Sequence, residues 1–239
     1  MRHRRILVKL SGEAMAGSDG FGLNLKAIEK YATDISGAVR AGAQLAVVVG
    51  GGNFFRGYTG ASSNLPRAGA DYIGMLATMM NTLALREVLT SLGVDAEAMS
   101  SVPMPSVCQT FNRVQALAAI RQGTVVICGG GTGNPFVTTD TAAVLRAAEL
   151  ECNAVYKGTQ VDGVYSADPR EDESAKRFDR IDFDHVIRED LKVMDLAAIA
   201  LAREAAMPIV VFDIHKPDAL TTILSGRGIC TEVVPRADA

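Results

Sequence analysis

Short apolar runs alternate along the chain with longer segments in which apolar residues recur every three or four positions. The short, β-branched runs predict strands and the longer periodic segments predict helices. The predicted strands cover residues 5–10, 45–49, 96–99, 124–128, 154–156, 209–212 and 229–233. The predicted helices cover residues 25–41, 69–92, 113–122, 139–150, 195–206 and 217–224. Residues 166–180 are polar, contain Pro169 and predict an exposed loop.

This alternation predicts an α/β fold, in which a mostly parallel sheet carries helices on both faces. The run at 45–49 is apolar throughout, as expected of a strand that is buried on both sides. The chain shows no linker-like stretch and no internal repeat, so we predict a single domain over residues 1–239.

Composition narrows the function classes. Apolar residues make up 48% of the chain, enough for a sizeable core, and the net charge of −3 favours neither a nucleic-acid nor a membrane partner. The four cysteines and three histidines are scattered, which predicts reduced cysteines in the core and no metal site made by cysteine or histidine. No apolar run reaches the roughly 18 residues of a membrane span, and the run at 6–8 is too short for a signal peptide, so we expect a cytoplasmic protein.

Three glycine-rich segments, at residues 9–13, 50–57 and 129–140, each follow a predicted strand. Ligands of open α/β sheets bind at the carboxyl ends of the strands, where glycine lets backbone amides approach a phosphate. A single glycine pair is more simply a tight turn, but three such segments at one sheet edge predict a polyphosphate site. None matches the P-loop or the dinucleotide fingerprint.

Three charged residues in these segments are candidates for catalysis. Lys9 ends an apolar strand, where its charge needs a partner such as phosphate, although a lysine that protects an edge strand is an alternative. Arg56 follows the second glycine segment and has the fork geometry for phosphate oxygens. Asp140 opens a helix, where an acid also has a purely structural explanation.

The segments KLSGE, VVVGGGNFFRG, GTGNPFVTTD, KGTQVDGVYSADP and LKVMDLAA together resemble the bacterial uridylate kinases of the amino-acid kinase superfold. The resemblance covers roughly residues 5 to 234, and GTGNPFVTTD and LKVMDLAA are its most specific parts. It implies a three-layer αβα sandwich and transfer of the γ-phosphoryl group of ATP, with Mg²⁺, to UMP.

The resemblance also implies a set of site residues. Those expected to bind ATP are Lys9, Leu10, Ser11, Gly12, Gly52, Arg56, Thr159, Tyr165 and Asp168. Those expected to bind UMP are Gly51, Asp71, Thr132, Gly133, Asn134, Pro135, Phe136, Val137, Thr138 and Thr139. Lys9, Arg56 and Asp140 are the expected catalytic residues, with Asp140 either orienting Lys9 or holding Mg²⁺ through water. Asp71 suits two ribose hydroxyls better than a phosphate, because like charges repel.

Two other functions compete with this one. A carboxylate kinase of the same superfold would need a cationic pocket and no ribose-binding acid, and a non-catalytic nucleotide sensor would not need Lys9, Arg56, Asp140 and Asp168 together. The resemblance further implies a homo-oligomer, a hexamer, that is activated by GTP and inhibited by UTP. The apolar set on the helix at 69–92 is broad enough to face another subunit, or to be buried within its own. Some relatives have basic residues where this chain has Glu97 and Thr124, while Arg86 is kept, so we expect a small GTP effect.

Overall fold

The computed structural model describes residues 1–55 and 65–236. Nine of the strands in these residues form one sheet in the order β4-β3-β5-β2-β1-β6-β10-β11-β9. They are β1 (Arg5–Leu10), β2 (Gln44–Val49), β3 (Ala96–Ser100), β4 (Gln109–Thr110), β5 (Val125–Gly129), β6 (Ala154–Thr159), β9 (Arg180–Asp182), β10 (Ile209–Asp213) and β11 (Thr231–Val234). All neighbouring pairs are parallel except β10 and β11. The predicted mostly parallel sheet is therefore confirmed.

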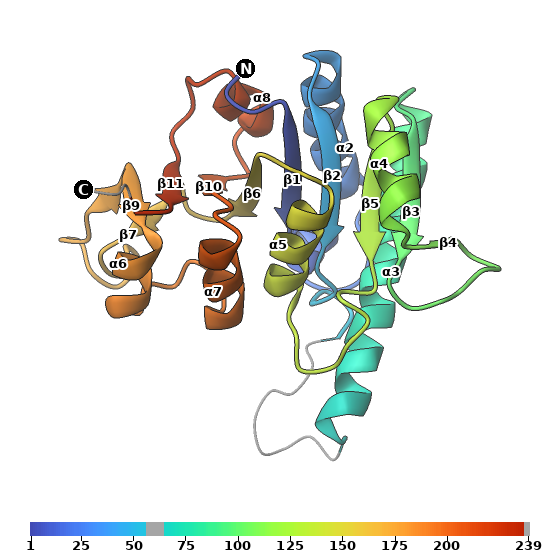
Figure 1. The fold of residues 1–239 in the computed structure, drawn as a ribbon, viewed down its shortest axis with the longest axis horizontal. Helices are drawn as coiled ribbons and strands as arrows, with labels where there is room; N and C mark the ends of the chain where they lie inside the picture. The colour runs from blue at the N-terminus through green and yellow to red at the C-terminus, as the bar shows by residue number, and fades with distance from the viewer. Residues whose placement is uncertain (56–64, 237–239) are drawn as a thin grey trace.

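Helices cover both faces of this sheet, as Figure 1 shows with α5 in front of the strands and α2 behind them. One core cluster joins the sheet to α2 (Leu25–Arg40), α3 (Arg67–Ser91) and α8 (Ala219–Leu224). The other joins it to α4 (Arg113–Arg121), α5 (Thr139–Glu149), α6 (Phe183–Arg188) and α7 (Leu196–Glu204). The fold is thus the expected three-layer αβα sandwich.

Alternation along β1 directs its side chains to the two layers. Ile6, Val8 and Leu10 belong to the cluster with α2, and Leu7 belongs to the cluster with α5. Successive side chains of a strand point to opposite faces, so Lys9 shares the α5 side with Leu7. This parity determines which helix can supply a partner for the Lys9 charge.

The elements differ from the predicted ones mainly where they are short. The pattern did not predict α1 (Gly12–Ala16), the 3₁₀ turn η1 (Gly17–Asp19), β4 or α6. The loop predicted at 166–180 contains β8 (Arg177–Phe178) and the start of β9, and β8 pairs with β7 (Val164–Tyr165) as a separate antiparallel ribbon. Elements of two to six residues carry too few positions for periodicity to reveal them.

The cysteine prediction was half right. All four cysteines carry free thiols, but only Cys128 and Cys152 are buried, whereas Cys108 and Cys230 are partly exposed. Burial raises the pKa of the Cys128 and Cys152 thiols to about 12, as expected of unreactive core residues.

Candidate active site

The three glycine-rich segments meet at the carboxyl edge of the sheet, because β5, β2 and β1 are adjacent and parallel. The first segment turns directly into α1, whose N-cap Ser11 accepts a hydrogen bond from the Glu13 amide. Gly12 lies so close to the second segment that a Cβ atom would stand 2.6 Å from the Gly52 amide nitrogen and 2.8 Å from the Gly50 carbonyl oxygen. Only glycine fits there, which explains the close packing of the first two segments.

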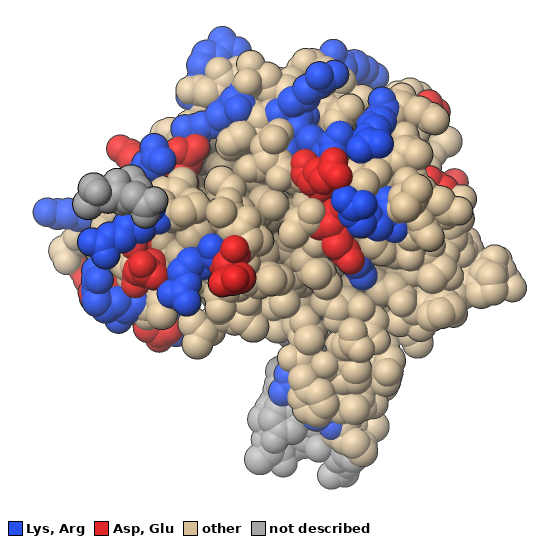
Figure 2. Space-filling model, in the orientation of Figure 1, with Lys and Arg blue, Asp and Glu red and all other residues tan. Residues whose placement is uncertain are grey.

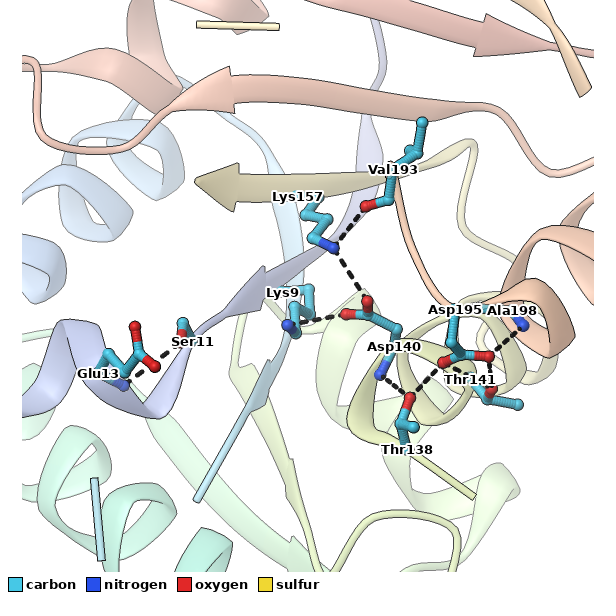
Figure 3. Close-up of polar contacts among 10 residues, drawn as sticks. All are labelled: Lys9, Ser11, Glu13, Thr138, Asp140, Thr141, Lys157, Val193, Asp195 and Ala198. Carbon is cyan, nitrogen blue, oxygen red and sulfur yellow. Dashed lines mark hydrogen bonds and ion pairs between the residues drawn. The ribbon is translucent and has the colours of Figure 1, made fainter. Parts of the chain in front are cut away.

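A cluster of two lysines and one aspartate lies at this edge (Figure 3). Lys9 Nζ is 2.7 Å from Asp140 Oδ1, and Lys157 Nζ is 2.9 Å from Asp140 Oδ2. Each carboxylate oxygen therefore has its own ammonium group. The three side chains are only 11%, 15% and 15% exposed for Lys9, Asp140 and Lys157, so the charges interact in a poorly solvated environment.

Strand register brings the two lysines together. Lys9 on β1 and Lys157 on β6 are direct partners in the parallel pairing of these strands, so they point to the same face. Lys157 also donates a hydrogen bond to the Val193 carbonyl. Two ammonium groups this close would repel each other, and the Asp140 carboxylate between them compensates the repulsion.

The electrostatics of the cluster reflect opposing effects. Burial alone would raise the pKa of Asp140, but the charges and hydrogen bonds of Lys9 and Lys157 outweigh it and hold that pKa below its ordinary value. Burial lowers the pKa of Lys157, with Lys9 adding to the effect and Asp140 opposing it. Lys157 therefore gives up its proton more readily than an exposed lysine.

Sequence reasoning missed Lys157, although the signal was available. Lys157 follows the apolar run at 154–156 in the way that Lys9 follows the run at 6–8. The argument that a lysine ending a buried strand needs an anionic partner applies equally to both.

The position of Asp140 depends on a second missed residue, Asp195. Thr138 is the N-cap of α5 and accepts from the Asp140 amide at 3.1 Å. The Thr138 hydroxyl in turn donates to Asp195, which also accepts from Thr141 at 3.2 Å and from the Ala198 amide at 2.9 Å as the N-cap of α7. Asp195 thus joins the first turns of α5 and α7. The LKVMDLAA segment that contains it carried the resemblance, but no role had been predicted for the aspartate.

Two cavities open on one side of the cluster. One, of about 440 Å³, is lined by Lys157 and by three residues predicted to bind ATP, Thr159, Tyr165 and Asp168. The other, of about 820 Å³, is lined by Lys9, Lys157, Thr159 and Ser11, with Lys30 adding positive charge. The two cavities adjoin at Lys157 and Thr159, which line both, and are together called the recess.

The other predicted ATP-binding residues differ in which of their atoms can face a ligand. The side chain of Leu10 is buried in the core, so only its backbone can face a ligand. Gly52 has open space on the side where a Cβ would stand. Arg56 lies outside the described residues.

The residues predicted to bind UMP lie mainly in the segment 129–139, which leads into α5 just before Asp140 and is called the acceptor loop after this predicted role. Phe136 and Val137 are 68% and 37% exposed, and Thr139 is the first residue of α5. Thr132 Oγ1 accepts from the Asn134 amide, which shapes the turn that includes Gly133 and Pro135. Gly51 packs against α3, where a Cβ would stand 2.8 Å from the Ala77 side chain.

Asp71, the predicted ribose-binding residue, already contacts this loop. Its Oδ2 atom accepts a hydrogen bond of 2.7 Å from the Phe136 amide, and the carboxylate pairs with Arg67 one helical turn away at 3.2 Å. Phe136 has a φ of +69°, an unusual backbone conformation for a residue other than glycine. Asp71 therefore stabilises a strained residue of the acceptor loop in addition to any role toward a ligand.

The described residues offer no cluster of side chains typical of a metal site. Among residues 1–55 and 65–236, no group of three or more histidine, cysteine, aspartate or glutamate side chains is gathered as a metal ion would require. Both oxygens of Asp140 face lysine ammonium groups. Of the helices described, none has both the length and the apolar character needed to cross a membrane.

The family model of the amino acid kinase family matches residues 4–213. The chain therefore belongs to this family of enzymes. Its mostly parallel αβα sandwich carries the lysine–aspartate–lysine cluster at the carboxyl edge of the sheet. The uridylate kinase of Chelativorans sp. (strain BNC1) is 53% identical over 97% of this chain and 94% of the relative, and that of Anaplasma phagocytophilum (strain HZ) is 48% identical over 98% and 95%. The crystal structure of UMP kinase from Bacillus anthracis matches with a TM-score of 0.95 and 38% identity over 99% of this chain and 98% of that one. Within the family, the chain is a member of the uridylate kinases.

Proposed function

We propose that the protein transfers the γ-phosphoryl group of ATP to UMP, giving ADP and UDP. The observation that carries this proposal is the position of the Lys9–Asp140–Lys157 cluster, between the recess lined by Thr159, Tyr165 and Asp168 and the acceptor loop. Its uridylate kinase relatives support the choice of acceptor. ATP occupies the recess, and UMP lies against the acceptor loop.

Phosphoryl transfer asks the protein to position the reactants and to compensate charge on the transferring oxygens. Lys9 and Lys157 supply two ammonium groups, and Asp140 keeps them close together and oriented before substrate arrives. The amides at the start of α1, next to Ser11 and Gly12, add fixed dipoles suited to phosphate. Arg56 follows the second glycine-rich segment in the sequence and adds a further cation in this proposal.

Mg²⁺ enters with ATP in this proposal, since magnesium in such sites is commonly held through substrate phosphates and water. Asp140 has its two oxygens on Lys9 and Lys157, which favours orientation of the lysines over direct metal binding. We place the reaction in the cytoplasm, where ATP and UMP are available.

The nearest alternative is a carboxylate kinase of the same family. Asp71 beside the acceptor loop argues against it, because a carboxylate repels an acidic substrate but accepts hydrogen bonds from ribose. An ADP-release assay over UMP, CMP, dUMP, glutamate, aspartate and acetylglutamate discriminates between the two. We expect the highest rate with UMP, and a higher rate with any acidic amino acid would overturn the proposal. In a thermal-shift measurement, UMP should raise the melting temperature more than acetylglutamate does.

We further propose a hexamer that GTP activates weakly and UTP inhibits. The support in the structure is an exposed apolar stripe on α3, formed by Tyr72, Ile73, Leu76 and Met80 at 47%, 41%, 52% and 44% exposure. The first half of α3 extends below the body of the molecule and carries few charged side chains on the face that Figure 2 shows. Other apolar residues of the same helix, Met75, Met79 and Leu89, are instead buried within the subunit.

The GTP effect should be small because the candidate cations are few. Arg86 pairs with its neighbour Glu87, and Glu97 and Thr124 offer no positive charge to a triphosphate. Light scattering tests the assembly, and UMP saturation curves with and without millimolar GTP test the regulation. A monomer at assay concentration, or superimposable curves, would contradict these proposals.

A further inference from the structure

Arg146 is a buried arginine that the proposed mechanism does not use. It lies in α5 at 6% exposure, and its guanidinium carbon is 3.9 Å from the centre of the Phe111 ring. One terminal nitrogen pairs with Glu149, and the other, Nη2, donates to Ser101 Oγ at 2.9 Å. A guanidinium removed from water is costly, and the buried Nε of Arg146 has no hydrogen-bond partner among the described residues, so an apolar residue would serve better if the position only filled space.

The contact with Ser101 determines the direction of the serine hydroxyl. Arginine has donors and no acceptor, so Ser101 Oγ must accept from Arg146. Its own hydrogen is then available for the Gly131 carbonyl, which lies 2.7 Å away. A charged donor on one side of a hydroxyl strengthens the bond that the hydroxyl makes on the other.

Ser101 holds the beginning of the acceptor loop at two points. Its amide donates to the Gly129 carbonyl at 3.0 Å, and its hydroxyl donates to the Gly131 carbonyl. Gly131 has a φ of +58°, which glycine adopts without strain but with much conformational freedom, so the bond from Ser101 restricts a backbone that would otherwise be free to move. The hydrogen bond that the Gly131 carbonyl accepts thus comes from Ser101, a residue outside the loop.

We infer that Arg146 is a positioning residue for the acceptor, acting through Ser101 on the Gly131 carbonyl to hold the acceptor loop in its binding conformation. The inference rests on the proposed function, since it takes residues 132–139 as the UMP side of the site. It assigns the nucleoside monophosphate, and not ATP, as the ligand whose binding Arg146 controls. Arg146 touches neither the substrate nor the Lys9–Asp140–Lys157 cluster in this account.

The arrangement requires arginine and not merely a cation. The planar fork directs one nitrogen to Glu149 and another to Ser101, while the flat face stacks on Phe111. Lysine is a point charge on a flexible stem and cannot keep all three contacts. Arg146→Lys therefore keeps the charge but should loosen the bond to Ser101.

A double-mutant cycle tests the inference. Ser101→Ala, Arg146→Lys and the double variant are compared with wild type for kcat, KM for UMP, KM for ATP and melting temperature. We expect each single variant to raise the KM for UMP about 3- to 10-fold, the size expected for one hydrogen bond, and to leave the KM for ATP within about twofold. The double variant should be no worse than the worse single variant, because both changes break the same chain of contacts.

Arg113→Lys is the matched control. Arg113 lies on α4 and binds the same end of α5, through the Glu149 carbonyl at 2.7 Å and Glu151 at 2.9 Å, without touching Ser101. It should leave the KM for UMP within about twofold of wild type even if it lowers the melting temperature. If Arg146→Lys does not fold, Ser101→Ala alone still tests the loop contact, because it removes one hydroxyl from a partly buried position.

The outcomes separate this inference from the proposed function. Wild-type protein that does not phosphorylate UMP refutes the proposed function itself. Wild-type activity with UMP, combined with variants that lose thermal stability at an unchanged KM for UMP, makes Arg146 a purely structural residue and overturns the inference. Equal rises in the KM for UMP and for ATP, or additive effects in the double variant, also overturn it.

Discussion

The two loops beside the Lys9–Asp140–Lys157 cluster are held in different ways. The acceptor loop is bound by residues far away in the sequence: Asp71 is 65 positions from Phe136, Thr78 is 52 positions from Gly130, and Ser101 is 30 positions from Gly131.

Most side-chain contacts in the donor segment, residues 159–178, are local. Tyr165 donates to Asp162 three positions away, and Arg170 binds Asp168 two positions away. Contacts with distant residues lie mainly on the short strands of the segment, where the Val164 amide donates to Thr231, Arg177 donates to the Cys230 carbonyl and Thr231 donates to the Phe178 carbonyl.

This difference indicates how each side is shaped. A loop held by several separate elements keeps its geometry only when the whole fold is in place, and it then presents a fixed surface. The turn around Asp162 and Asp168 is held mostly by its own residues, so its geometry depends less on the rest of the molecule. We therefore expect the acceptor side to discriminate sharply between ligands and to be sensitive to substitutions in α3, β3 and α5. The donor side should tolerate single substitutions better.

The largest effect should come from the cluster that serves both sides. Lys9→Ala should lower kcat by at least about 10²-fold, the scale for one preorganised electrostatic contact, with little change in the KM for UMP. Steady-state kinetics measure both constants. Lys30→Ala is the control, because Lys30 lines the same cavity but donates to the His215 carbonyl. If the kcat of Lys9→Ala stays within a few-fold of wild type, or the kcat of Lys30→Ala falls by as much, Lys9 does not act on the transferring phosphoryl group.

A substitution confined to the acceptor side sharpens the contrast. Asp71→Ala should raise the KM for UMP about tenfold and reduce the preference for UMP over dUMP, with the KM for ATP unchanged. The reason is that a carboxylate which accepts from ribose hydroxyls has less to bind when one hydroxyl is missing. Kinetics with both nucleotides measure the preference.

Asp71→Asn separates the two roles of this residue, because the amide oxygen can still accept from the Phe136 amide. Recovery of a near-normal KM by Asn would assign Asp71 to support of the loop. Unchanged discrimination between UMP and dUMP in both variants would remove Asp71 as the ribose-binding residue.

The pH dependence of kcat tests Lys157, which lies between the two sides. Its pKa is lowered from the ordinary 10.5 of a lysine by burial, so its charge is complete below the lowered pKa and is lost as pH rises through it. We expect kcat to fall on the alkaline side before an exposed lysine would titrate. Lys157→Arg keeps its charge and should move this fall to higher pH, provided that circular dichroism shows a folded protein. An alkaline limb that does not move would point to another group.

The smallest effect should come from the donor segment. Tyr165→Phe removes the hydroxyl that donates to Asp162 at 2.7 Å, a local contact near the surface. We expect the KM for ATP to rise no more than about twofold and the KM for UMP to stay constant, because an exposed hydrogen bond contributes little net stability. A rise of tenfold or more would mean that the donor side is as tightly specified as the acceptor side.

The sequence predicted the long elements and the edge at which the site lies, because buried strands and amphipathic helices leave strong periodic signals. Lys9 was predicted because a lysine is unusual at the end of an apolar strand, and Asp140 because it follows a glycine-rich segment. Lys157 carried the same signal and was missed. Asp195, Ser101 and Arg146 could not be found in this way, since their importance comes from contacts across 30 to 57 positions that no local pattern encodes. The resemblance supplied the predicted substrate-binding residues, but it did not supply the contacts that hold them in place.

The transfer of the γ-phosphoryl group from ATP to UMP is tested most directly by identifying the product formed from ATP. Wild-type protein is incubated with Mg-ATP and an equimolar mixture of UMP, CMP, dUMP, glutamate and acetylglutamate, and the reaction is followed by phosphorus NMR. We expect the γ-phosphoryl group to appear as the β-phosphate of UDP, with Lys9→Ala nearly inactive in parallel. Accumulation of an acyl phosphate, or release of inorganic phosphate without UDP, would contradict it.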